Sequence, residues 1–164
     1  THDLDLVRWL GDAAIERASA ETQHRMGRER EDVALAHGRL ENGRAFQCSV
    51  DWLSPTKVRR TGVLGERGML VADTLRADLT FYANAQVPTA GWTEMQALRG
   101  VAEGDMTRYA LQRREPLAVE LERFARYAAG GDESGVVSLA EGLATVRVAE
   151  ACLRSAASGE TVRP

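Results

Sequence analysis

The sequence predicts an α+β domain with two layers, in which a large, open and predominantly antiparallel sheet carries helices on one face. Three observations predict this class. Residues 33–84 alternate strand-like runs with turn signals, as a meander of antiparallel strands does. Two amphipathic helices follow, at 115–129 and 138–157. The chain has 164 residues, 44% hydrophobic and 27% charged, which suits a single domain over 1–164.

The first elements are a short helix and a short strand. Apolar residues recur at helical spacing over 3–10, and Gly11 is expected to end this helix as the residue after its last turn. Residues 13–21 have strand character. The polar segment 22–31 is expected to form an exposed loop.

The pair Asn42-Gly43 lies between two strand-like runs and predicts a β-hairpin with a two-residue type I′ turn. In that register one face is bulky and is expected to be buried, with Val33, Leu35, Cys48, Val50 and Trp52 on it. The opposite face is small and polar and carries Ala34, Ala36, Gly38, Ala45, Gln47, Ser49 and Asp51. We expect this second face to stay open, because two helices can cover only one side of such a sheet.

The rest of the sheet is predicted from turns and apolar runs. A turn at 65–68 joins two strands, and an irregular connection at 85–106 is long enough to be functional or mobile. The strands expected here are 57–64, 69–73, 77–84 and 107–114.

Both C-terminal helices are expected to pack on the bulky face of the sheet. Ser138 and Glu141 have the spacing of a capping box, and Gly159 is the expected residue after the last turn. The apolar stripe of the first helix consists of Leu117, Leu121, Phe124 and Ala128. That of the second consists of Leu139, Leu143, Val146, Ala149 or Glu150, Leu153 and Ala156.

Composition excludes several classes of function. The net charge is −3 without a basic patch, so we expect no nucleic-acid partner. No apolar run approaches the roughly 20 residues that span a bilayer, so we expect no membrane partner. Cys48 and Cys152 suit buried free thiols, which favours a reducing, cytoplasmic location. The 164 residues contain neither GxGxxG nor a P-loop, and the three histidines lack metal-ligand spacing.

Several stretches, together covering nearly the whole chain, occur in the order and spacing of a known domain. The sequence resembles the C-terminal domain of the glucose–fructose oxidoreductase, inositol dehydrogenase and rhizopine catabolism (Gfo/Idh/MocA) family. The matching stretches are HDLDLVRWL (2–10), AHGRLENGRAFQCSVDWLSPTKVRR (36–60), GERGML (65–70), REPLAVELERF (114–124) and VRVAEACLRSAASGETV (146–162).

The resemblance implies the substrate-binding and oligomerising half of a dehydrogenase acting on a sugar, nucleotide sugar or cyclitol. Family members bind NAD or NADP in an N-terminal Rossmann domain, which has no counterpart here, so we expect these residues alone to bind no cofactor. The resemblance also implies that the protein forms a homodimer or homotetramer through the open face of the sheet. The alternative is a stand-alone module that dimerises through its sheet and does no chemistry. Whether the chain is an excised fragment, a cleavage product or a natural single-domain protein stays open.

The resemblance also implies one catalytic residue. The family has an Asp-x-x-x-His pair at the start of this helix, and His2 falls on its histidine, while the aspartate position precedes Thr1. A histidine can accept the proton of a sugar hydroxyl near neutral pH. The candidate substrate-binding residues are Asp3, Asp5, Lys57, Arg59 and Trp92. Each candidate also has an alternative role without function. The four charged residues can be solvated surface charges, and the tryptophan can be a packing residue.

Overall fold

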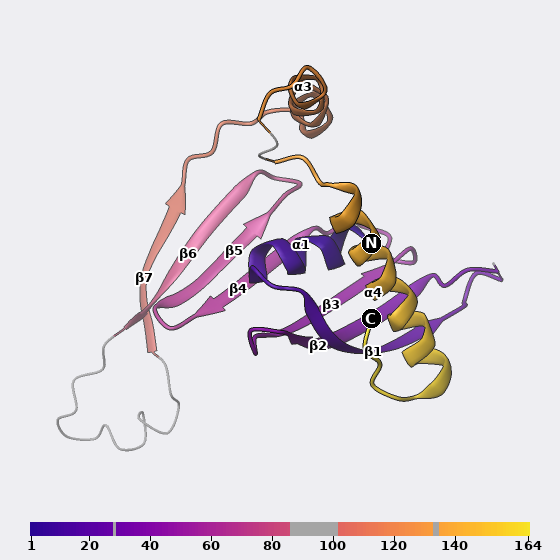
Figure 1. Ribbon diagram of the computed structural model, residues 1–164. Coiled ribbons are helices and arrows are strands. Elements are labelled where there is room, and N and C mark those ends of the chain that lie inside the picture. Colours follow the sequence, from indigo (N-terminus) through magenta and orange to yellow (C-terminus); the bar gives the residue numbers. More distant parts are fainter. Residues whose placement is uncertain (28, 86–101, 133–134) are drawn as a thin grey trace, which may run out of the picture. The chain divides into compact units, whose positions relative to one another are not determined.

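The computed structural model describes residues 1–27, 29–85, 102–132 and 135–164 (Figure 1). All described strand pairs are antiparallel, so the α+β class and the antiparallel pairing are confirmed. The elements in order are α1 (His2–Gly11), β1 (Ile15–Gln23), β2 (Val33–Leu40), β3 (Ala45–Asp51), β4 (Arg60–Gly65), β5 (Gly68–Asp73), β6 (Asp78–Ala85), β7 (Ala102–Tyr109), α3 (Pro116–Ala128) and α4 (Leu139–Ser158).

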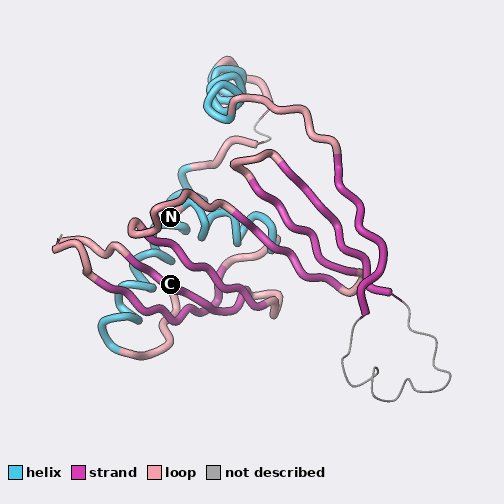
Figure 2. The backbone as a smooth tube through the Cα atoms, turned by 180° about the vertical axis from the view of Figure 1, so that it is seen from behind, coloured by secondary structure: helices cyan, strands magenta, loops and turns pink. Residues whose placement is uncertain are grey.

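The strands form two sheets, where the sequence predicted one. One sheet has the order β1-β2-β3 and the other β4-β5-β6-β7 (Figure 2). The ladder stops after Asp51 because its carboxylate turns the chain, accepting the N–H groups of Leu53 at 2.9 Å and Ser54 at 2.6 Å. Pro55 then follows, and a proline cannot donate to a ladder. The chain divides nearby into two compact units, Thr1–Pro55 with Arg123–Pro164, and Thr56–Glu122.

The β2–β3 hairpin differs from the predicted register by one residue. The N–H of Leu40 donates to the carbonyl of Arg44 at 2.8 Å, and the N–H of Gly43 donates to Leu40 at 2.9 Å. Gly43 has a φ of +85°. The connection therefore has three residues, Glu41, Asn42 and Gly43, with the glycine in the left-handed position of a bulge.

This shift mixes the two predicted faces, because one step moves the β2 side chains to the other side relative to those of β3. Ala36 now shares the core face with Cys48, and Leu35 shares the opposite face with Ser49. Ala36 and Leu40 are buried, whereas Leu35 is 49% and Trp52 77% exposed. The predicted burial of Leu35, Val50 and Trp52 is therefore wrong. The predicted open face is wrong for its β2 half, because Ala36 lies in the core of the first unit. Its β3 residues Ala45, Gln47 and Ser49 are exposed on the face opposite the core.

The core of the first unit lies between the β1–β3 sheet and the two helices α1 and α4, which cover the same side of it (Figure 1). Small residues on the sheet allow α4 to approach closely. The buried apolar side chains are Leu4, Ile15, Ala18, Ala20, Ala36, Leu40, Val148 and Cys152. Val7, Phe46 and Cys48 pack against them.

The face of α4 that packs on the sheet is not the predicted one. Leu139 is 92% exposed, and Leu143, Val146 and Leu153 are exposed too. The buried side chains are instead Thr145, Val148, Ala151, Cys152 and Ser155. The small side chains on this face of α4 pack closely against the alanines of the sheet. The Ser155 hydroxyl accepts the N–H of Ala20 at 3.0 Å and donates to the Glu160 carbonyl at 2.6 Å.

The observed helix ends agree with those predicted from the sequence, with one exception. The capping box of Ser138 and Glu141 is present, and Gly159 takes the left-handed position after α4, as predicted. At the end of α1, Gly11 is the last helical residue and Asp12 takes the left-handed conformation, with a φ of 50°. No described helix combines the length and apolar character needed to cross a membrane.

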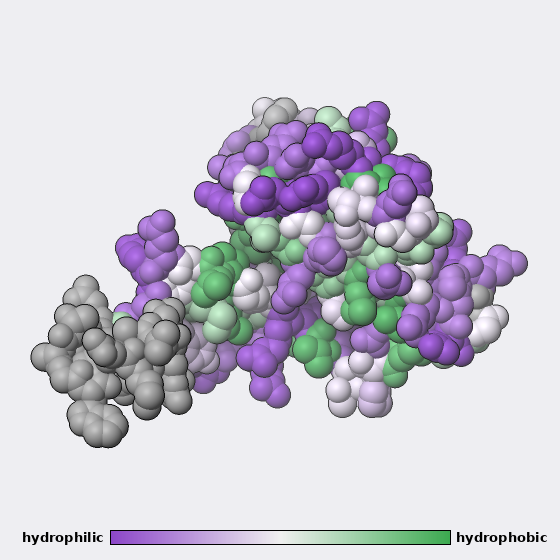
Figure 3. Space-filling model, turned by 90° about the horizontal axis from the view of Figure 1, so that it is seen from below, coloured by the Kyte–Doolittle hydropathy of each residue, from purple (hydrophilic) through white to green (hydrophobic). Residues whose placement is uncertain are grey.

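The predicted packing of the other C-terminal helix on the sheet is not observed. None of the residues of α3 is buried, and Leu117, Leu121 and Phe124 are exposed. Exposed apolar side chains occur elsewhere as well: the face seen in Figure 3 has several hydrophobic patches separated by hydrophilic side chains.

The second unit contains the turn that the sequence predicted at 65–68, with Gly65 paired to Gly68. Its last strand, β7, begins earlier than predicted. Gly104, inside the connection predicted at 85–106, lies where a Cβ atom would come within 2.7 Å of the Ala83 carbonyl oxygen. A glycine is needed there because the strands approach closely beside a bulge.

Candidate functional site

Three of the candidate site residues lie together at the start of α1. His2 and Asp3 are exposed, and Asp5 follows in the same turn. Among the described residues, none makes a polar contact with the His2 side chain. The imidazole is therefore accessible to a substrate. The two carboxylates also interact favourably with the positive end of the helix dipole.

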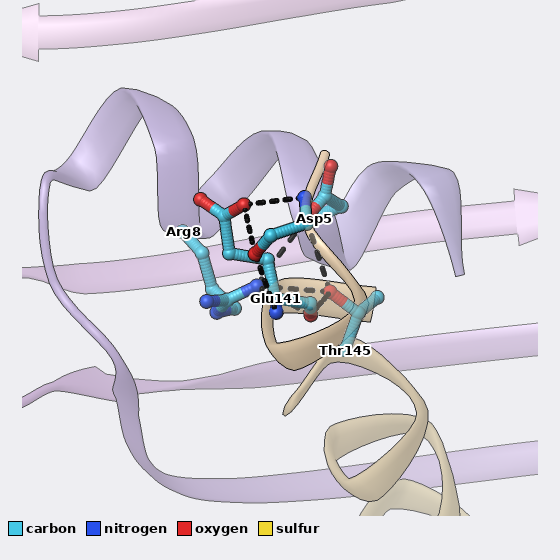
Figure 4. Close-up of polar contacts among 5 residues, drawn as sticks. Asp5, Arg8, Glu141 and Thr145 are labelled. Atoms are coloured by element: carbon cyan, nitrogen blue, oxygen red, sulfur yellow. Dashed lines mark hydrogen bonds and ion pairs between the residues drawn. The ribbon is translucent and has the colours of Figure 1, made fainter. Parts of the chain in front are cut away.

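A polar network fixes α1 to α4 just behind this start (Figure 4). Arg8 Nη1 donates to Asp5 Oδ1 at 3.3 Å, to Thr145 Oγ1 at 3.0 Å and to the Glu141 carbonyl at 3.1 Å. Thr145 Oγ1 lies 3.0 Å from both Asp5 Oδ1 and that carbonyl, so its single proton can be donated to either. The network orients the helix that carries His2.

Sequence reasoning missed most of this network. Arg8 and Asp5 have the three-residue spacing of a helix ion pair, which could have indicated their contact. Thr145 is distant in sequence, and no local pattern points to it. The Arg8 side chain is 16% exposed, and its Nε is buried without a partner among the described residues. Asp5 therefore has a structural role, and its predicted contact with substrate remains a prediction.

Glu141 adds a negative charge beside Arg8. The Ser138 hydroxyl and N–H donate to its carboxylate at 2.6 Å and 2.7 Å. These hydrogen bonds, with a smaller contribution from Arg8, hold the pKa of Glu141 below its usual range. The carboxylate is thus charged at neutral pH and stabilises the start of α4.

A second carboxylate in this unit, that of Asp32, binds backbone N–H groups through one oxygen, while its buried Oδ1 has no partner among the described residues. Asp32 is buried and accepts the N–H groups of Arg25 at 2.7 Å and Met26 at 2.6 Å. Burial alone would raise its pKa, but these hydrogen bonds and the nearby His24 lower it below its usual value. Asp32 therefore anchors the loop between β1 and β2.

The two cysteines are free, as expected. Burial raises the pKa of the Cys152 thiol. Burial, and then the neighbouring Cys152 and Asp3, raise the pKa of Cys48. Both thiols are therefore protonated at neutral pH, which makes them poor nucleophiles.

Two of the other candidates lie in the second unit. Lys57 lines a cavity of about 380 Å³, together with side chains of β4, β5 and β6 that the sequence did not indicate. Arg59 is exposed and is not one of the lining residues. Trp92 lies outside the described residues. The structure thus brings His2, Asp3 and Asp5 together on one helix and places the two cations in the other unit.

To bind a metal ion or a dinucleotide, the described residues would need a group of ligating side chains or a turn that holds a pyrophosphate. No group of three or more His, Cys, Asp or Glu side chains among them could hold a metal. The sequence also contains no GxGxxG turn to hold a pyrophosphate.

A family profile described as the oxidoreductase family, C-terminal alpha/beta domain, matches residues 1–163. The chain also resembles solved structures. UDP-N-acetylglucosamine 3-dehydrogenase GnnA from Acidithiobacillus ferrooxidans is 24% identical, with a TM-score of 0.66 over 96% of this chain and 44% of that one. Aldose-aldose oxidoreductase from Caulobacter crescentus, complexed with glycerol, is 20% identical, with a TM-score of 0.69 over 99% and 45%.

A third similar structure is the WlbA dehydrogenase from Bordetella pertussis in complex with NADH and UDP-GlcNAcA. It is 21% identical, with a TM-score of 0.64 over 99% of this chain and 42% of that one. The chain thus spans less than half the length of these proteins. Among curated proteins, none matches the sequence significantly.

Proposed function

Because this chain belongs to the Gfo/Idh/MocA oxidoreductase family, whose C-terminal domain it matches over residues 1–163, we propose that it binds the substrate of an NAD(P)-dependent dehydrogenase. The family match is the observation that carries the proposal. The substrate class is a sugar, nucleotide sugar or cyclitol with an oxidisable hydroxyl. Support comes from the similar structures, which include a UDP-N-acetylglucosamine 3-dehydrogenase and an aldose-aldose oxidoreductase.

His2 is the proposed general base. It is exposed at the start of a helix that the Arg8 network holds in place. It would accept the proton of the substrate hydroxyl while the carbon is oxidised. The hydride acceptor, a nicotinamide, would be bound by another domain, because these residues do not suit a dinucleotide.

The substrate contacts of Asp3, Asp5, Lys57, Arg59 and Trp92 also belong to the proposal. Carboxylates and cations can hydrogen-bond sugar hydroxyls, and an aromatic ring can stack on a sugar face. We further propose a cytoplasmic location, which suits two free thiols.

Cofactor binding is tested by calorimetric titration of the 164-residue chain with NAD and NADP. We expect no heat of binding for either, since no phosphate-binding turn is present. Micromolar affinity for either dinucleotide would contradict the proposal that the cofactor is held by another domain.

The role of His2 is tested in the dehydrogenase that contains this chain and its nicotinamide-binding domain. His2→Ala should lower kcat by roughly 10²–10⁴, the usual contribution of a general base, and should change KM much less. His24→Ala, in the loop after β1, is the matched control and should leave kcat unchanged. A His2→Ala enzyme with normal kcat would remove this residue from the mechanism.

Oligomerisation is proposed through the face of the β1–β3 sheet that no described helix covers. Only part of the face proposed from the sequence is uncovered: Ala36 lies beneath the helices, whereas Gln47 and Ser49 are exposed on the opposite side. The uncovered face carries the exposed Leu35 and His37. Light scattering should show a dimer or tetramer that Leu35→Arg dissociates, whereas Leu64→Arg in the other sheet should not.

A stand-alone dimerisation module is the alternative function. Its support is the same uncovered face, which a second copy could bury in a self-complementary way. The two functions differ in one result: a module would dimerise and bind none of glucose, myo-inositol and UDP-N-acetylglucosamine in the calorimeter.

A further inference from the structure

The cavity in the second unit lies on one face of the β4–β7 sheet. Directly paired residues share a face, so pairing places Arg60, Asp73 and Asp78 in one row and Val71 and Thr80 in the next. These five residues line the cavity of about 380 Å³. Lys57 and Arg76 line it from the segments beside the strands, and Tyr82 adds an aromatic ring. We propose that this cavity binds an anionic oxygen group, a phosphate or a carboxylate.

The two carboxylates in the cavity are already engaged. Asp73 Oδ1 accepts the N–H groups of Leu75 at 3.0 Å and Arg76 at 3.1 Å. Asp78 Oδ1 accepts the Nε–H of Arg108 at 2.7 Å. Their negative charges are therefore largely balanced within the protein, which disfavours a cation as the ligand.

The positive charges in the cavity, unlike the carboxylates, have few partners within the protein. Among the residues of this unit that the structure describes, none forms an ion pair or hydrogen bond with the side chain of Lys57 or Arg60. Arg76 is only 3.9 Å from Asp73 Oδ2, a weak contact, and Arg113 donates to its carbonyl. Guanidinium groups recognise planar carboxylates and phosphates through paired hydrogen bonds, and an ammonium adds a point charge.

Thr80 lies in the same cavity. The residue is only 9% exposed, and within the described part of the chain no group hydrogen-bonds its hydroxyl. Its oxygen is not among the fully buried atoms without a partner, so the hydroxyl is accessible to a ligand in the cavity. Thr80 lines the cavity between Arg60 and Tyr82, where an anion oxygen could accept its proton.

The test is a two-dimensional amide NMR titration of the 164-residue chain with inorganic phosphate, glucuronate and glucose. Phosphate or glucuronate should shift the amides of Arg60, Val71 and Thr80, with millimolar dissociation constants that weaken as sodium chloride is added. Glucose should bind about tenfold more weakly or not at all. Binding of phosphate alone identifies a phosphate group as the source of the anion, and binding of glucuronate alone identifies a carboxylate. No shift with either anion overturns the proposal.

Three variants localise the binding. Arg60→Gln should weaken it about tenfold or more, because a charged hydrogen bond is lost. Thr80→Val keeps the shape of the side chain and should weaken it about threefold to tenfold. Arg67→Gln, at the β4–β5 turn, removes an equal charge away from the cavity and should change nothing. If Arg67→Gln weakens binding as much as Arg60→Gln, or if Thr80→Val has no effect while its spectrum stays folded, the anion is not bound in this cavity.

This inference shares Lys57 with the proposed substrate contacts, but its test is separate from that of the dehydrogenase role. The anion titration follows residues of the second unit, whereas the dehydrogenase role is tested with His2 in the first. A cavity that binds no anion would therefore leave the oxidoreductase proposal unchanged.

Discussion

The two sheets differ in how their faces are covered. The β1–β3 sheet presents small residues such as Ala18 and Ala36 and is packed beneath α1 and α4. The β4–β7 sheet carries larger apolar side chains, yet Val63, Leu64 and Leu70 remain exposed. Large apolar residues therefore do not indicate the buried face here. Small residues indicate it, because they allow a helix to approach the strands closely.

The largest expected effect comes from adding one methyl group to a glycine in each sheet. At Gly38, a Cβ would lie 2.1 Å from the Arg17 carbonyl oxygen and 2.8 Å from the Phe46 ring. Gly38→Ala should therefore cost about 3 kcal/mol in the free energy of unfolding, the upper range for overpacking. Urea denaturation followed by circular dichroism measures this loss.

Gly62→Ala is the matched variant in the other sheet. A Cβ there would meet no atom within 4 Å. We expect the stability to stay equal or to rise by about 0.4–1 kcal/mol, because alanine restricts the unfolded chain more than glycine does. Equal losses at Gly38 and Gly62 would contradict the difference in packing between the sheets.

A smaller effect is expected from the network between α1 and α4. Arg8→Met removes three hydrogen bonds but keeps the apolar stem, and Thr145 still holds Asp5. We expect a loss of about 1–2 kcal/mol in urea denaturation. Arg147→Met, on the exposed side of α4, is the control and should lose little. Equal losses would show that the network contributes no specific stability to the covered sheet.

The smallest effect concerns the start of α4. Ser138→Ala removes the cap and should cost about 1 kcal/mol at pH 7. The pKa of Glu141 is lowered in the folded state, so its contribution is present above the ordinary glutamate value of 4.5 and is lost as the pH falls through the folded value. The difference between wild type and Ser138→Ala should therefore narrow at acid pH. A difference that widens below pH 4.5 would contradict this assignment.

Much of the fold could be predicted from the sequence because its signals are local. The capping box at Ser138 and the turn at 65–68 depend on a few neighbouring residues. The hairpin register could not, since Asn42-Gly43 suits both a two-residue and a three-residue connection. Only the packing of Ala36 beneath the helices selects between them.

The candidate site also has a part that could be predicted from local sequence signals and a part that could not. The position of His2 at the start of a helix follows from local spacing and is confirmed, while its catalytic role remains a prediction. The cavity around Thr80 could not be predicted, because its residues come from three strands whose register the sequence does not determine. A row of Arg60, Asp73 and Asp78 becomes visible only once the strands are paired.

The discontinuity of the first unit has a consequence for protein synthesis. Ala18, in β1, exchanges two backbone hydrogen bonds of 2.9 Å with Val162, near the opposite end of the sequence. The β1–β3 sheet also lacks the cover that α4 provides until this helix has left the ribosome. Protein synthesis adds roughly 5–20 residues per second, so α4 becomes available roughly 5–20 seconds after Pro55 is translated. During that interval the apolar face of the sheet is exposed to chaperones and to other nascent chains.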